Sequence, residues 1–223
     1  MEERRIANEF EAFSVAWEVT GFSALPNVVP SARPITVERD NTPFVWKELT
    51  GAPAWSVDFN NVSLPLNSAT PGVKDPYKRR FIVLILANTG RVWSVRSIWD
   101  QPVPDLKPEP SPEVAEAQMR PEKDVYVGLP SANPRINFLD ALDIVLTKGV
   151  GSPFQAKEID GVYVMESEQN STPRAVWAIT LRGIPPLPVS DPSIPVWQRN
   201  RMRNVVEVNT GKLLFATNSP QPR

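Results

Sequence analysis

Two stretches, ILANTGRVWSV at Ile85–Val95 and VEVNTGKLLFA at Val206–Ala216, decide the fold predicted for this chain. Each contains an apolar run, then Asn-Thr-Gly, a basic residue and a second apolar run. A three-residue loop that ends in glycine joins two strands into a hairpin when the glycine takes the left-handed conformation of a bulged turn. The sequence therefore predicts two β-hairpins, with Gly90 and Gly211 as structural turn residues.

A helical pattern precedes each predicted hairpin. FEAFSVAWEVTG at Phe10–Gly21 places Phe10, Phe13 and Trp17 on one face, and FLDALDIVLTKG at Phe138–Gly149 has a similar apolar face. Both segments stop at a glycine, which commonly ends a helix. We expect two amphipathic helices whose apolar faces cover a sheet.

Alternating strands lie between the helices and the hairpins. AWSVDFNNVSLPL at Ala54–Leu66 aligns with VWAITLRGIPPLP at Val176–Pro188, and both alternate in the same phase. FIVLILA at Phe81–Ala87 is apolar at every position, which predicts a central strand buried on both faces. The recurrence of the same elements in the same order favours internal duplication over chance similarity.

A Pro- and Glu-rich stretch, DQPVPDLKPEPSPEVAEAQMRPEKD at Asp100–Asp124, separates the halves. It has few large apolar residues and cannot build a core of its own. The predicted division is a module at 1–99, a linker at 100–123 and a module at 124–223. The predicted fold class is α+β, with two helix-on-antiparallel-sheet modules in tandem.

The repeated unit resembles the PepSY domain and its relatives. The segment at Leu139–Gly149 matches the helix pattern of that family, and the hairpin at Val205–Phe215 matches its last hairpin. The resemblance spans Arg135–Ser219 in the better copy and Asn8–Ser97 in a diverged one, where a predicted extra strand, PITVERD, and the bulky residues of the helix depart from the pattern. It implies a cystatin-like arrangement in a non-catalytic, extracytoplasmic bacterial module that binds or inhibits peptidases or acts in assembly.

The residue inventory excludes most catalytic chemistries. The chain has no Cys and no His, so it has no thiolate nucleophile, no classical Ser-His-Asp triad and none of the commonest transition-metal ligands. No phosphate-binding or dinucleotide-binding glycine motif occurs. Asp140 and Asp143 share a predicted helix face but fit a solvated face better than an acid-base pair. We expect no enzymatic activity, no catalytic residues, no metal site and no cofactor.

The charged residues nearly balance, with 24 basic and 25 acidic side chains and a net charge of -1, which disfavours nucleic acid as a partner. Two basic rows begin the predicted hairpins and are candidate sites for an anion, an acidic peptide or lipid headgroups; the alternative is that they keep an exposed strand soluble and unpaired. Aromatic residues beside loops are further candidates for an interface. The candidate interaction residues are Lys78, Arg79, Arg80, Trp99, Trp197, Arg199, Arg201 and Arg203.

No apolar run reaches the roughly 20 residues of a membrane-spanning helix, and MEERRIANEF at the start has no apolar signal core. The sequence leaves open a periplasmic or cell-surface location, which the resemblance favours, and a cytoplasmic one. The predicted function is a non-enzymatic protein-interaction, scaffolding or assembly subunit of the bacterial envelope, with a protein partner, a membrane-proximal partner or self-association. The alternative is a peptidase inhibitor or a propeptide-like chaperone.

Overall fold

The computed structural model describes residues 5–25, 28–38, 49–65, 78–98, 126–167, 172–185 and 201–217. In these ranges the chain forms helices α1 (Glu9–Thr20) and α3 (Phe138–Lys148), with a short 3-10 helix, η1 (Phe22–Ala24), after α1. The strands are β1 (Pro30–Thr36), β2 (Pro53–Val62), β3 (Arg79–Leu86), β4 (Val92–Ile98), β5 (Tyr126–Gly128), β6 (Glu158–Glu166), β7 (Arg174–Arg182), β8 (Arg201–Glu207) and β9 (Leu213–Thr217).

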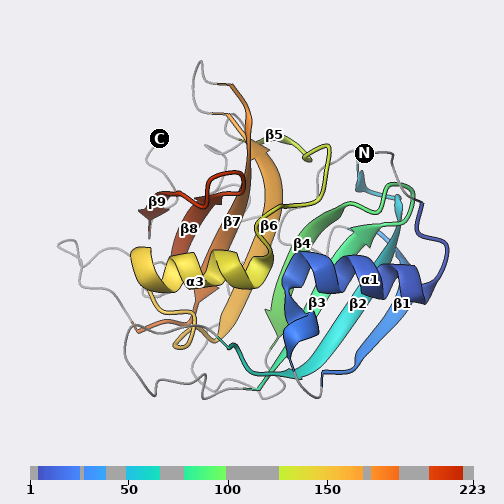
Figure 1. Cartoon of the computed structure of the whole chain (residues 1–223), viewed down its shortest axis with the longest axis horizontal. Helices are drawn as coiled ribbons and strands as arrows, with labels where there is room; N and C mark the ends of the chain where they lie inside the picture. Colours follow the sequence, from blue (N-terminus) through green and yellow to red (C-terminus); the bar gives the residue numbers. More distant parts are fainter. Residues whose placement is uncertain are drawn as a thin grey trace.

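All of these strands belong to one antiparallel sheet (Figure 1). The order is β1-β2-β3-β4-β6-β7-β8-β9, and β5 pairs with β6 beside this path. The prediction of two tandem helix-on-sheet modules is therefore wrong. The halves do not each close a sheet of their own, because the last strand of the first half pairs directly with the long first strand of the second.

The junction between the halves is a short backbone ladder between β4 and β6. Ser94 lies opposite Val162, and Arg96 lies opposite Asp160. Beyond the ladder, the backbone N–H of Ile159 donates a 2.7 Å hydrogen bond to the Ser97 hydroxyl. Pairing at this junction satisfies backbone groups that two separate sheets would have left at exposed edges.

Both helices cover the same face of the sheet and follow each other end to end (Figure 1). Gly21 ends α1 in the left-handed conformation, with φ of 79°. A Cβ atom at Gly21 would lie 2.8 Å from Oδ1 of Asn137, the residue that caps the N-terminus of α3. The negative end of one helix dipole therefore approaches the positive end of the next, and glycine is required for this approach.

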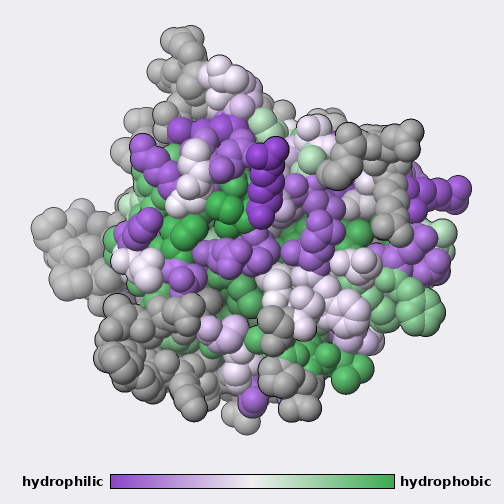
Figure 2. All heavy atoms as spheres, viewed as in Figure 1, coloured by the Kyte–Doolittle hydropathy of each residue, from purple (hydrophilic) through white to green (hydrophobic). Residues whose placement is uncertain are grey.

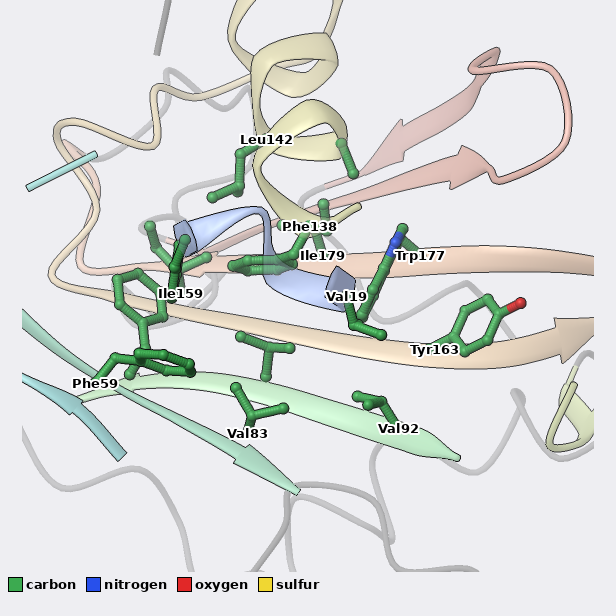
Figure 3. Packing of buried hydrophobic residues seen from close by; sticks show 14 of the residues in the cluster. Val19, Phe59, Val83, Val92, Phe138, Leu142, Ile159, Tyr163, Trp177 and Ile179 are labelled. Atoms are coloured by element: carbon green, nitrogen blue, oxygen red, sulfur yellow. The ribbon is translucent and has the colours of Figure 1, made fainter. Parts of the chain in front are cut away.

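One apolar core lies between the helices and the sheet and runs through both halves. Figure 3 shows Val19 of α1 and Phe138 and Leu142 of α3 pointing into the same layer. Phe138 crosses the junction, because its ring lies 6.1 Å from that of Phe81 in β3 and 5.5 Å from that of Trp177 in β7. Gly161 of β6 makes room for Phe138, since a Cβ atom there would collide with the ring.

The face of α1 that enters the core differs from the expected one. The buried residues of α1 are Ala12, Val15, Ala16, Val19 and Thr20. Phe13 and Trp17 are partly buried and pack against this core, whereas Phe10 is 73% exposed, so the prediction is wrong for Phe10. Small side chains allow the helix to lie close to the strands, while Phe13 and Trp17 pack against the core with part of their surface exposed and Phe10 projects into solvent.

Matched positions in the two halves have matched conformations. Gly90 and Gly211 both have φ of 66°, and each donates its backbone N–H to the carbonyl four residues earlier. Asn61 is the one non-glycine residue with positive φ in the described ranges, and it aligns with Gly183, which has φ of 65°. These correspondences extend the sequence alignment to backbone geometry.

Candidate interaction surfaces

The first predicted basic row is divided between the two faces of the sheet. Arg79 is fully buried on the helix side, where Nη1 donates to the carbonyl of Ala156 at 2.7 Å and Nη2 donates to that of Pro153 at 3.2 Å. Arg80 points to the opposite face and forms an ion pair with Asp58 at 3.1 Å. Lys78 is exposed. Arg79 thus ties β3 of the first half to the loop after α3, and the three cations do not form one surface.

The second predicted row is partly described. Arg201 and Arg203 lie on the same face of β8, and Arg203 is 9% exposed. Both side chains have interaction partners within the protein. The alternative that these cations protect an exposed edge strand is wrong for the described residues, because β8 is paired with β7 and β9, and β3 is paired with β2 and β4. Arg199, Trp99 and Trp197 lie outside the described residues, as does the predicted linker at 100–123.

A belt of charged side chains crosses the face of the sheet away from the helices. We define this charged belt as Asp58, Arg80, Arg96, Glu158, Asp160, Arg182, Arg201 and Arg203. Asp160 is its centre: Oδ2 lies 2.9 Å from Nη1 of Arg182, and Oδ1 lies 3.4 Å from Nε of Arg96. Arg182 also contacts Glu158 at 3.3 Å. Sequence reasoning missed Arg96, Asp160 and Arg182 because only strand register brings them together.

The charged belt connects strands rather than forming an open binding site. Asp160 is 2% exposed, and its pairs with Arg96 and Arg182 cross from β4 through β6 to β7. A buried carboxylate is stabilised only when it has such partners. In the described ranges no group of three potential ligands among Asp, Glu, His and Cys could hold a metal ion. The belt is therefore interpreted as a cross-strand network at the junction.

An aromatic stripe on α1 is the clearest exposed apolar feature. The stripe consists of Phe10, Phe13 and Trp17; the centroids of the first two rings are 6.2 Å apart, and those of the last two are 6.0 Å apart. Val29, just before β1, is 75% exposed. Figure 2 shows apolar surface beside α1 on this side of the molecule. Large aromatic side chains at a helix surface are typical of protein interfaces.

The two outer edges of the sheet are the remaining candidate surfaces. β1 is the first strand of the described sheet, and its residues are exposed or half-buried. β9 is the last, and Leu213, Leu214, Phe215 and Ala216 are half-buried. The outer edge of a terminal strand carries backbone donors and acceptors that can pair with another strand.

One titratable group stands out in the helix-side core. Burial raises the pKa of Tyr163 to about 12, because the ionised phenolate would lose its hydration there. Its ring lies 5.3 Å from that of Trp177. This shift stabilises the neutral form and gives Tyr163 no acid-base role at neutral pH.

Comparisons with known proteins return no relative: no protein-family profile, curated protein or solved structure matches the chain. The resemblance to PepSY domains therefore stays a prediction. None of the helices in the described ranges is long and apolar enough to cross a membrane.

Proposed function

We propose that this chain is a non-enzymatic interaction and assembly protein, and that the aromatic stripe on α1 is a contact surface for a protein partner. The observation that carries the proposal is the 73% exposure of Phe10, whose ring continues the row formed by Phe13 and Trp17. Burial of one such side chain against a partner contributes about 1.5–3 kcal/mol.

The arrangement of the rings supports contact with a folded partner surface. Successive rings along one helix flank form a continuous strip, and α1 packs on the sheet through its buried small residues, with Phe13 and Trp17 also packed against the core. A pre-ordered strip of aromatic groups binds with little loss of side-chain entropy. The bacterial envelope stays the predicted compartment for this role.

Substitution of Phe10 tests the proposal, because Phe10 contributes little to the core. The tagged chain is used to capture proteins from cells of its source, and the amount of each captured protein is compared between wild type, Phe10→Ser and Glu18→Ser. Glu18 is exposed on the same helix outside the stripe and is the matched control. We expect a stoichiometric partner whose capture falls at least about tenfold in Phe10→Ser and is unchanged in Glu18→Ser.

Equal capture by Phe10→Ser and Glu18→Ser would show that the aromatic stripe is not part of the interface. The alternative function, a peptidase inhibitor, is tested with the same proteins: dose-dependent loss of a peptidase activity from the extract, without a stoichiometric non-peptidase partner, would overturn the assembly proposal.

A further inference from the structure

The outer edges of the sheet are the counterparts of the two strands that join the halves. The first half runs α1-β1-β2-β3-β4, and the second half runs β5-α3-β6-β7-β8-β9, in which the short strand β5 has no counterpart among the described residues of the first half. β4 and β6 are paired, whereas their counterparts β9 and β1 are the terminal strands of the described sheet. We propose that β9 of one molecule pairs with β1 of a second copy, as β4 pairs with β6 inside each molecule. This inference goes beyond the proposed contact through α1, because the joint uses the two outer strands of the sheet and not the aromatic stripe.

The internal junction between β4 and β6 is a short ladder of backbone pairs. Three residue pairs connect β4 to β6: Ser94 with Val162, Val95 with Gly161, and Arg96 with Asp160. The ladder is antiparallel, and side chains from both halves pack above it in one core. A joint of the same length between two copies would contain three matched residues on each edge.

The hairpins fix which residues of β9 correspond to those of β4. Val92 lies opposite Ile85 in the first hairpin, and Leu213 lies opposite Val206 in the second. Both hairpins have a register shift at the same point, just before these pairs. Counting onward gives the β9 counterparts of the junction residues in β4, which are Phe215, Ala216 and Thr217.

The neighbouring strands fix the correspondence between β1 and β6 in the same way. Ala32 lies opposite Val57, and Gly161 lies opposite Ile179, which aligns with Val57. The β1 counterparts of the junction residues in β6 are therefore Ser31, Ala32 and Arg33. The proposed joint is antiparallel and pairs Phe215 with Arg33, Ala216 with Ala32, and Thr217 with Ser31.

The faces of the two edges agree in this register. Ala32 and Ala216 both pack against the core on the helix side, whereas Phe215 packs against the apolar cluster on the opposite face. Arg33 alternates with Ala32 and so shares the face of Phe215 in the joint. An arginine beside an aromatic ring is favourable, and no like charges lie opposite each other.

Proline placement in β1 is compatible with the joint. Pro30 and Pro34 lack backbone donors and are tolerated at sheet edges. They flank the segment from Ser31 to Arg33 and do not interrupt it. The two prolines restrict pairing to a short segment, and that segment is as long as the internal ladder.

A joint of this kind is heterologous, because β9 of one copy meets β1 of the next and each end remains open. Repetition gives a chain or ring of copies rather than a closed dimer. The in-line arrangement of α1 and α3 within one molecule indicates that helices of successive copies would continue along the same face of the sheet (Figure 1).

Disulfide trapping tests the register directly, because the chain has no native cysteine. The variant Ala32→Cys/Ala216→Cys places one thiol on each outer edge. The two positions lie at opposite ends of the sheet within one molecule, so only a bond between copies can form. Residues directly opposite in an antiparallel ladder are about 4.5–5.5 Å apart at Cα, within the range of a disulfide.

Mild oxidation of the double variant is expected to give covalent multimers on a non-reducing gel, with masses that are multiples of the 24.9 kDa chain. The matched control, Thr36→Cys/Ala216→Cys, keeps both prolines, displaces the β1 thiol by four residues on the same face and should give at least about tenfold less product. Light scattering of the wild-type chain over a concentration series should show a rising mean mass.

Two results would overturn the inference: a wild-type mass that stays monomeric with no covalent ladder, or equal cross-linking by the displaced pair. Either result leaves the proposed function intact if a partner is still captured through Phe10. If no partner is captured through Phe10 but the covalent multimers still form, the proposed contact through the aromatic stripe is wrong and the proposed joint stands.

Discussion

Trp55 and Trp177 occupy matched positions in β2 and β7, yet only Trp177 is fully buried. Both indole N–H groups donate to the carbonyl of an isoleucine just before a helix, Ile6 at 3.3 Å and Ile136 at 2.9 Å. The difference lies in the adjacent strand. Trp177 lies opposite Tyr163 of β6, an interior strand, whereas Trp55 lies opposite Pro34 of β1, an edge strand.

This comparison indicates that position in the sheet, rather than local sequence alone, determines how deeply each tryptophan is buried. The second half has neighbours on the side where the first half ends at an edge. The same indole hydrogen bond is 3.3 Å long in the first half and 2.9 Å long in the second.

Replacement of each tryptophan by alanine should have the largest effect on the free energy of unfolding, and the effect should differ between the two halves. Trp177→Ala removes a fully buried ring and should lower the free energy of unfolding by about 4 kcal/mol, whereas Trp55→Ala should lower it by about 2 kcal/mol. Urea unfolding followed by circular dichroism measures both. Equal losses would show that the edge position of β1 does not matter to Trp55.

Replacement of adjacent arginines in β3 compares a fully buried contact across the junction with a partly exposed ion pair between neighbouring strands. Arg79→Met leaves the carbonyls of Pro153 and Ala156 without their donors and should cost about 3 kcal/mol. Arg80→Met removes a partly exposed arginine from its pair with Asp58, which is itself 7% exposed, and should cost about 1.5 kcal/mol. The prediction fails if the Arg80 variant is the less stable of the two in urea.

Tyr163 and Pro34 occupy matched positions opposite the two tryptophans, but only Tyr163 has a side chain that can ionise. The free energy of unfolding should therefore depend on alkaline pH through Tyr163. The pKa of Tyr163 is raised from its ordinary 10.0 to about 12 in the folded state, so its contribution is fully present below pH 10 and is lost as the pH rises through about 12. Stability should fall by about 2 kcal/mol between pH 10 and pH 12 from this group.

Unfolding measurements across this pH range, compared with Tyr163→Phe, isolate the effect. The variant should show a shallower decline because it has no phenol to ionise. An identical decline in both proteins would contradict the buried, neutral state of Tyr163.

The smallest expected effect concerns the matched left-handed positions in β2 and just after β7. Asn61→Gly should change stability by less than about 0.5 kcal/mol, because both residue types tolerate φ of 58°. Gly183→Asn should cost about 1 kcal/mol, since a Cβ atom there would lie 2.8 Å from Cβ of Lys157. Thermal unfolding measures this difference. A larger loss of stability in Asn61→Gly than in Gly183→Asn would contradict the prediction.

Local features were predictable from the sequence because they depend on nearby residues. The Asn-Thr-Gly turns, the two helices and the alternating strands follow from glycine conformation and apolar periodicity. The buried face of α1 was only partly predictable in this way: the aromatic spacing grouped Phe10 with Phe13 and Trp17, but Phe10 is exposed and small residues fill most of the buried face.

Long-range pairing is the part that the sequence did not reveal. The alternation of apolar and polar residues within one strand does not identify its partner strand. A continuous sheet and two separate sheets therefore have similar sequence patterns. The charged belt was missed for the same reason, because Arg96, Asp160 and Arg182 are distant in the chain and meet only through that pairing.

The central claim, that β4 and β6 join both halves into one sheet, is tested most directly by a disulfide across the junction. Ser94 and Val162 lie directly opposite each other, so Ser94→Cys/Val162→Cys should form a disulfide within a single 24.9 kDa molecule, identified by mass spectrometry of its linked peptides. The displaced pair Ser94→Cys/Val164→Cys should remain largely reduced. Free thiols in the first variant, or equal bonding in both, would contradict the single sheet.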